Sequence, residues 1–250
     1  MKRGSYFSGA LAASILTAAL VAGWATPGYA QDAPKLAFTG SATLTTDYMF
    51  RSVSNTSQNP AAQVEFDASY GIFWAYIWGS NTEFGEGLEI DYGGGISPKW
   101  NDITFTIGGL EYTYPIADGI DYFELKTGGV WAKGPWSIGL NNYWSPNNFN
   151  LDTQSDALEG AIGYTFPHWK IWNFFSPSIS GTLGNQWYEK TNIVPDYLYW
   201  NVGMTFAFLN HWSADIRYYD TNYSKDDCFI NSGGRDNCDA RAVGTIKATF

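Results

Sequence analysis

Carboxylate side chains in this sequence recur two residues apart, and Glu89 and Asp91 are one such pair. Side chains at positions i and i+2 of a β-strand share a face, so two carboxylates there could perform acid–base chemistry. Polar residues that alternate with apolar ones along a strand give the same spacing without any catalytic role. We therefore interpret the pair as part of a polar sheet face.

The other polar residues do not predict an enzyme. A hydrolytic site requires a nucleophile, a base and an orienting group within hydrogen-bond reach. His168 and His211 fall in separate predicted turns, and neither neighbours an obvious nucleophile. The segment DYGGGIS lacks the lysine and the helix of a phosphate-binding loop. We expect no catalytic residues and no cofactor.

Cys228 and Cys238 are the two cysteines of the chain. In an exported protein they are expected to form a disulfide, which would restrain the loop that contains them. Aspartates nearby offer the alternative of a metal site, but two thiols match no closed structural zinc pattern. We expect the disulfide and no bound metal.

Residues 1–30 have the features of an export signal. A basic start is followed by an apolar run and by the small-x-small pattern Gly28-Tyr29-Ala30. An N-terminal membrane anchor is the alternative, but the run is short for a spanning helix. We predict a cleaved signal peptide over 1–30 and one domain over 31–250.

The composition is unusual for a soluble domain. Only 15% of residues are charged, 18% are aromatic, and the formal net charge is −10. Soluble domains average about 25% charged residues, and nucleic-acid-binding proteins favour basic surfaces, so we expect no nucleic-acid partner. After residue 30 no apolar stretch is long enough for a helical membrane span. A closed β-barrel is the other structure that crosses a bilayer, and it suits the aromatic content.

Period-two alternation between turn signals predicts twelve strands. In QVEFDASY, for example, Val64 and Phe66 share one face, and Glu65 and Asp67 share the other. The predicted strands cover residues 36–48, 61–70, 72–82, 87–97, 102–114, 120–132, 135–145, 156–166, 174–184, 196–208, 211–220 and 240–250. The pattern leaves open which faces of 72–82 and 135–145 point outward.

The connections between these strands alternate in length. The first and the eleventh are long and polar, whereas the second and the tenth are tight turns around Gly71 and Asn210. Outer-membrane barrels combine short periplasmic turns with long external loops. The predicted fold is therefore an all-β, transmembrane, antiparallel up-and-down barrel with both termini periplasmic. Phe250 would end the closing strand and resembles the terminal signal that the barrel-assembly machinery reads.

In such a barrel the polar strand faces line the lumen. A water-filled pore with charged walls and a packed interior of acid–base pairs are both open interpretations, and twelve strands leave room that favours a narrow pore. Arg51 is an expected counter-charge near the external mouth. Among the other predicted lining residues, acidic side chains outnumber basic ones by eight to four, which predicts a preference for cations. The predicted lining residues are Asp47, Arg51, Glu65, Asp67, Glu89, Asp91, Glu124, Lys126, Glu159, Asp215, Arg217, Arg241 and Lys247.

Aromatic residues near predicted strand ends fit interfacial belts, where amphipathic rings lie at the level of lipid headgroups. Ordinary core packing is the alternative interpretation. The candidates are Tyr48, Tyr70, Trp78, Trp100, Tyr114, Trp131, Trp144, Trp172, Trp200 and Trp212.

Four motifs resemble those of the TorF family of exported proteobacterial proteins. They are TTDYMFRSVSNTSQNPA at 45–61, EIDYGGG at 89–95, YTYP at 112–115 and DYFEL at 121–125. The typical family opening, S-D-Y-x-F-R-G-x-S, is matched at Asp47, Tyr48, Phe50, Arg51 and Ser54, while Ser52 stands where the family usually has glycine. The resemblance implies an outer-membrane barrel that is named a porin mainly by inference, and it implies no particular solute.

Together these features predict a passive outer-membrane channel for small hydrophilic solutes or ions. The alternative is a closed barrel with a structural, adhesive or ligand-binding role through its external loops. The expected partners are outer-membrane lipid, the barrel-assembly machinery during insertion, and the solutes, and assembly into a homo-oligomer is left open.

Overall fold

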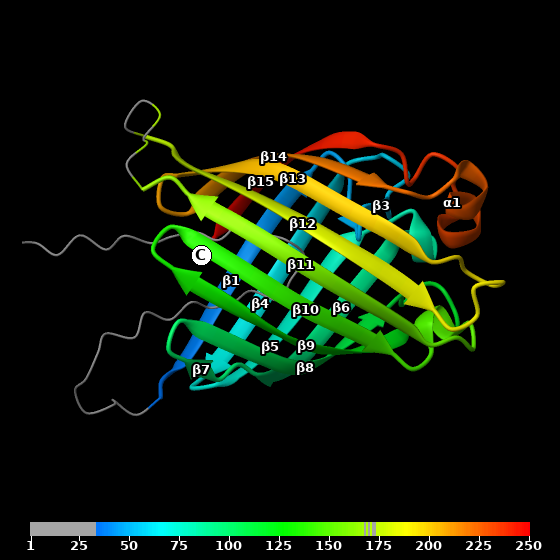
Figure 1. The fold of residues 1–250 in the computed structure, drawn as a ribbon, viewed down its shortest axis with the longest axis horizontal. Helices are drawn as coiled ribbons and strands as arrows, with labels where there is room; N and C mark the ends of the chain where they lie inside the picture. Colours follow the sequence, from blue (N-terminus) through cyan, green and yellow to red (C-terminus); the bar gives the residue numbers. More distant parts are fainter. Residues whose placement is uncertain (1–33, 168, 170, 172–173) are drawn as a thin grey trace, which may run out of the picture.

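Twelve antiparallel strands close into a barrel in the computed structural model of the chain (Figure 1). The structure describes residues 34–167, 169, 171 and 174–250, so the predicted signal peptide, His168 and Trp172 lie outside the described residues. The barrel strands are β1 (Leu36–Thr45), β4 (Ala61–Tyr70), β5 (Phe73–Asn81), β6 (Leu88–Ile96), β8 (Ile103–Thr113), β9 (Tyr122–Lys133), β10 (Trp136–Ser145), β11 (Ser155–Thr165), β12 (Ser176–Tyr188), β13 (Tyr197–Phe208), β14 (Trp212–Thr221) and β15 (Arg241–Thr249).

Shorter elements lie in the connections. They are β2 (Met49–Phe50), β3 (Val53–Ser54), β7 (Lys99–Trp100), the 3₁₀ helices η1 (Phe84–Gly87) and η2 (Asn148–Asn150), and the helix α1 (Lys225–Ser232). Among the described residues, no helix has the length and apolar character needed to cross a membrane.

The first and last barrel strands pair to close the sheet. β1 runs antiparallel to β15 with Ser41 opposite Thr249, and β6 pairs with β8 elsewhere in the ring. Gly40 and Phe250 exchange two backbone hydrogen bonds, of 2.8 and 2.9 Å. The Phe250 ring lies over Gly40, where a Cβ atom would come within 2.5 Å of the ring. Closure gives each of the twelve barrel strands a partner on both sides, so β1 and β15 are not left as edges that could pair with another chain.

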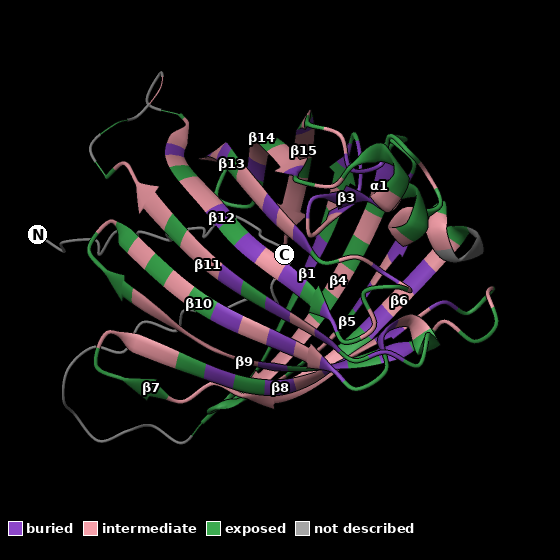
Figure 2. Cartoon of the chain, turned by 45° about the vertical axis from the view of Figure 1, so that its right-hand side comes forward, coloured by how far each residue is buried: buried purple, intermediate pink, exposed green. Residues whose placement is uncertain are grey.

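Buried and exposed residues alternate along the strands (Figure 2). The exposed set includes many large apolar residues, whereas the buried set is largely polar or aromatic. The structure settles the two segments whose facing the sequence left open. In β5, Ile77 is exposed whereas Trp78 and Ser80 are buried. In β10, Leu140 is exposed whereas Tyr143 is buried. The inner face of the barrel is therefore not purely polar, because it includes large aromatic rings.

The connections differ at the two ends of the barrel, as their alternating lengths predict. α1 and the long connections lie at one end, and the tight turns lie at the other, together with the C-terminus (Figure 1). β1 ends at Thr45 and not at residue 48, and β12 continues to Tyr188 and not only to 184. The first connection is therefore longer than expected, spanning 46–60, and the ninth is shorter, spanning 189–196.

The buried core lies inside the barrel in its long-loop half, and it contains rings that the sequence assigned to interfacial belts. Tyr48, Trp78 and Tyr114 are 1%, 8% and 2% exposed, so the belt prediction is wrong for these three. Trp78 and Tyr114 contribute to the inner packing, and Tyr48 lies in a connection that turns inward. In contrast, Trp100 and Trp212 are exposed on the outside.

Ile216 and Ile230 offer a matched test of whether the outer face of the barrel contacts lipid. Both are well exposed, Ile216 on the outer face of β14 and Ile230 on α1 at the loop end. We expect Ile216→Lys to lower the free energy of unfolding by about 2–4 kcal/mol, because a lysine near the bilayer midplane is desolvated. Ile230→Lys should leave it nearly unchanged. Urea unfolding in lipid vesicles measures both, and equal effects would contradict a lipid-facing β14.

Candidate functional site

The connection 46–60, which we call the inward loop, crosses the barrel interior at its long-loop end. The Ser52 hydroxyl donates to the Trp200 carbonyl on β13 at 3.0 Å. The Ser54 amide donates to the Asn237 carbonyl at 2.8 Å, and the Asn55 carbonyl accepts from the Glu83 amide at 2.8 Å. These partners lie on β13 and in two other connections, so the loop is held from several sides.

A tight turn between β2 and β3 carries Arg51 to the tip of the inward loop. Arg51 and Ser52 have φ of 46° and 61°, in the left-handed region that two-residue hairpins require at both central positions. Glycine adopts this conformation without strain, which accounts for the glycine that the TorF family usually has at the position of Ser52. Ser52 fits here because its hydroxyl bonds to the far wall.

Arg51 forms a bidentate ion pair with Glu124 of β9. The two guanidinium nitrogens donate to the two carboxylate oxygens at 2.8 and 2.7 Å, and one of them also donates to Gln186 Oε1 at 2.7 Å. The Tyr112 hydroxyl donates to Glu124 Oε2 at 3.0 Å, and the Tyr143 ring lies 5.0 Å from the guanidinium. The ionic side chains are 5% and 0% exposed. A paired, hydrogen-bonded charge of this kind fixes the loop in one position.

Asp47 anchors the base of the inward loop. Its carboxylate accepts hydrogen bonds from the hydroxyls of Ser54 and Thr56 at 2.6 and 2.8 Å, and from Arg241 of β15 at 2.8 Å. Three donors from two segments satisfy one buried carboxylate. The loop is therefore fastened at its base as well as at its tip.

Two further carboxylates lie on the inner face of β6 beside the inward loop. Glu89 and Asp91 are 1% and 2% exposed, and Glu89 accepts a hydrogen bond from the Tyr48 hydroxyl at 3.2 Å. One oxygen of each carboxylate has no hydrogen-bond partner among the described residues. These side chains make this part of the interior acidic.

Tyr199 illustrates how the inner wall is built across three strands. Glu159 of β11 is opposite Gly184 of β12, which in turn is opposite Tyr199 of β13. The Tyr199 ring lies over Gly184, where no side chain obstructs it, and its hydroxyl donates to Glu159 at 2.9 Å. Lys126 lies 5.4 Å from the Tyr143 ring on the same inner wall.

The short-turn half of the interior is more open. Lys247 and Glu65 are 4.0 Å apart, with side chains 21% and 17% exposed, and Asp67 accepts from Thr39 at 3.1 Å. Arg217 pairs with Asp215 at 3.1 Å. Water reaches Glu65, Lys247 and Asp215. It is excluded from Arg217 and from the ion pair at the tip of the inward loop.

The structure places the thirteen predicted lining residues inside the barrel or in the inward loop, and it brings Arg51 and Glu124 together. Their role as the wall of a pore stays a prediction. Sequence reasoning missed the inner aromatic residues and Gln186. The inward position of Tyr122 could have been predicted from the sequence, because Tyr122 is two residues from Glu124 on the same strand and therefore shares its face.

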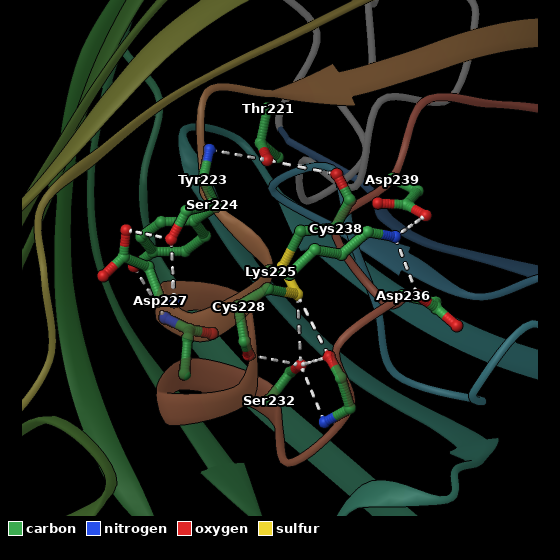
Figure 3. Close-up of a disulfide and its surroundings, with 12 residues drawn as sticks. Thr221, Tyr223, Ser224, Lys225, Asp227, Cys228, Ser232, Asp236, Cys238 and Asp239 are labelled. Atoms are coloured by element: carbon green, nitrogen blue, oxygen red, sulfur yellow. Dashed lines mark hydrogen bonds and ion pairs between the residues drawn. A yellow bond between two sulfur atoms is a disulfide. The ribbon is translucent and has the colours of Figure 1, made fainter.

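A disulfide between Cys228 and Cys238 ties α1 to the segment that leads into β15 (Figure 3). Lys225 bridges Asp236, at 2.7 Å, and Asp239. The hydrogen bond and charge of Lys225 lower the pKa of Asp236, and the two aspartates raise the pKa of Lys225. The pair therefore persists at neutral pH and is lost as the pH falls through the lowered pKa of Asp236. In the described part of the chain, no group of three or more His, Cys, Asp and Glu side chains could hold a metal ion.

Comparisons with known proteins bear on the whole barrel. A family model described as "Bacterial protein of unknown function (Gcw_chp)" matches residues 30–250. No curated protein matches the sequence. The matched description does not include the TorF name, so the resemblance to that family stays a prediction.

Among solved structures, the fold is similar to that of a structure described as "KdgM porin". The TM-score is 0.57 with 10% identity, over 85% of this chain and 99% of that chain. A structure described as "KdgM porin in complex with disordered oligogalacturonate" gives 0.55 with 10% identity, over 86% and 99%. A NanC porin structure gives 0.52 with 13% identity, over 86% and 99%. At these identities the likeness establishes the barrel fold.

Arg51 provides a test of how firmly the inward loop is held. We expect Arg51→Ala to lower the free energy of unfolding by about 3–5 kcal/mol, because Glu124 is left buried without its partner. Replacing both residues with methionine should recover much of that loss. Lys190→Ala, which removes the exposed ion pair with Asp152, is the control and should have little effect. Urea unfolding followed by tryptophan fluorescence measures all three, and equal losses for Arg51→Ala and Lys190→Ala would contradict the interpretation.

Proposed function

The chain belongs to the Gcw_chp family of bacterial proteins of unknown function, and from that premise we propose that it is a porin-like outer-membrane channel. It passes small hydrophilic solutes or ions passively and has no enzymatic activity. The shared barrel fold with the KdgM and NanC porins supports the proposal. The proposal also includes an outer-membrane location and a cleaved export signal over residues 1–30.

The observation that carries the proposal is the sorting of side chains around a closed sheet. Exposed apolar side chains such as Phe38 and Leu183 cover the outside. Charged side chains such as Glu65 and Lys247 lie inside, in a half of the barrel that water enters. A soluble protein would not place its apolar residues outside and its charges inside. A polar lumen inside an apolar cylinder is the arrangement that lets hydrophilic solutes cross a bilayer.

The inward loop narrows this passage. It brings Arg51 across the lumen to Glu124, and it buries the side chains at that level. A closed barrel that acts through its external loops is the second candidate function, and the same burial favours it. Conduction separates the two, since current steps in a planar bilayer require an open path and a closed barrel gives none.

The acidic excess on the inner wall supports a preference for cations. In the open half, the carboxylates Glu65 and Asp67 share the wall with the basic Lys247. Arg51, Arg217 and Arg241 each already have a carboxylate partner. The unbalanced charge in the interior is therefore negative. Negative wall charge attracts cations and repels anions.

The proposal also includes partners that the fold requires. Outer-membrane lipid covers the apolar surface, and the barrel-assembly machinery inserts the chain by way of the β15 terminus at Phe250. Assembly of several barrels into a homo-oligomer is compatible with this arrangement.

Removal of the contact at the tip of the inward loop should widen the passage. We expect a double variant, Arg51→Ala with Glu124→Ala, to give larger single-channel current steps than the parent, since two large side chains then no longer fill the lumen at this level. Planar-bilayer recording measures the steps. Equal steps in the two proteins would show that the inward loop does not limit conduction.

Selectivity depends on the carboxylates of the open half. We expect a double variant, Glu65→Gln with Asp67→Asn, to shift the reversal potential in a salt gradient away from the cation side, because two wall charges are removed. Glu189→Gln, which removes an exposed loop carboxylate, should leave the potential unchanged. Anion selectivity in the parent protein would refute the cation preference.

A further inference from the structure

A cavity of about 410 Å³ lies at the long-loop end of the barrel, above the tip of the inward loop. Its wall combines the inward loop with η1, η2, the end of β12 and the segment after α1. We call it the mouth cavity. Small-molecule sites in proteins have volumes of about 300–1,000 Å³, so the mouth cavity is large enough for an organic ligand.

Amide side chains dominate the polar lining of the mouth cavity. Five residues contribute them, from the inward loop, η2, β12, α1 and the segment after α1: Asn55, Asn148, Gln186, Asn231 and Asn237. Each amide has both a donor and an acceptor. A ligand hydroxyl also donates and accepts, so a polyhydroxylated ligand matches this lining better than one with a single kind of polar group.

Two of these amides have an unused polar atom. Gln186 is 1% exposed and Asn148 is 2% exposed. Gln186 Oε1 accepts from Arg51, while its Nε2 has no hydrogen-bond partner among the described residues. Asn148 Oδ1 likewise has none. Buried polar groups without partners are costly, and both of these residues line the same cavity.

Aromatic rings form the apolar part of the lining. Phe50, Phe84, Phe149, Tyr188 and Tyr197 all contribute. The faces of aromatic rings carry partial negative charge, which suits the C–H bonds on the face of a sugar ring. Phe149 has a φ of 48°, a left-handed conformation that a bulky residue rarely adopts. Backbone strain of this kind clusters at ligand sites.

The charge of the lining argues against an acidic ligand. Among the lining residues of the described chain, the charged ones are Arg51 and Glu83. They carry opposite signs, and Arg51 is already paired with Glu124. Arg51 therefore has no free charge to hold a carboxylate group, and the negative charge of Glu83 repels one.

We propose that the mouth cavity binds a neutral oligosaccharide, with the amides of Gln186 and Asn148 bonding to its hydroxyls. The biological setting of this site, at the entrance to a solute passage, rests on the proposed function. Binding itself does not require conduction, because the cavity is formed by the loop end of the barrel alone.

Calorimetric titration of the detergent-solubilised barrel tests the proposal with maltotriose as the neutral probe and trigalacturonate as the acidic one. Maltotriose should bind more tightly. Gln186→Met and Asn148→Leu should each weaken maltotriose binding by roughly three- to tenfold, the loss expected for one hydrogen bond. Gln154→Met, at an exposed glutamine outside the mouth cavity, is the control and should bind as the parent does.

The variants are first checked by their heat-dependent mobility on gels, so that only folded barrels are titrated. If either variant does not fold, the parent comparison of the two probes still decides the question. Absence of maltotriose binding, tighter binding of trigalacturonate, or unchanged affinity in folded variants would overturn the proposal. If the protein conducts ions but does not bind maltotriose, only the oligosaccharide site is rejected. If it binds maltotriose but does not conduct, only the proposed channel function is rejected.

Discussion

The closed ring of backbone hydrogen bonds is the constraint on which the rest of this structure depends. A strand inside a bilayer has no water to satisfy its amides and carbonyls, so each strand must have a partner on both sides. The final bonds between Gly40 and Phe250 complete this ring. Once the sheet is closed, the period of two along each strand separates the side chains into an outer and an inner set.

Closure also creates an interior that the side chains and loops must fill. In the short-turn half, charged residues share the space with water, as the partly exposed pair of Lys247 and Glu65 shows. In the long-loop half, the inward loop and the tyrosines occupy it instead. Burial of Arg51 is tolerated there because Glu124 and Gln186 satisfy it on two sides. The interior thus changes from wet to packed along the barrel axis.

Separate contacts hold the connections together at the long-loop end of the barrel. The disulfide holds α1 against the segment that leads into β15, and Asn237 in that segment accepts a hydrogen bond from the inward loop. The mouth cavity is therefore framed by covalent and hydrogen-bonded contacts between distant parts of the chain. A site built in this way is largely preorganised, which lowers the entropy that a ligand must lose on binding.

The sequence by itself determined the barrel. Alternation within β4 assigned Val64 and Phe66 to one face and Glu65 and Asp67 to the other, because the side-chain period of a strand is a local property. The tight turn at Gly71 and the long polar connections likewise marked the two ends. Only the tertiary structure decided the path of the inward loop, the pairing of Arg51 with Glu124 and the burial of Tyr48 and Trp78. Those contacts join residues far apart in the chain, and a sequence pattern has no information on which side chains meet across a lumen.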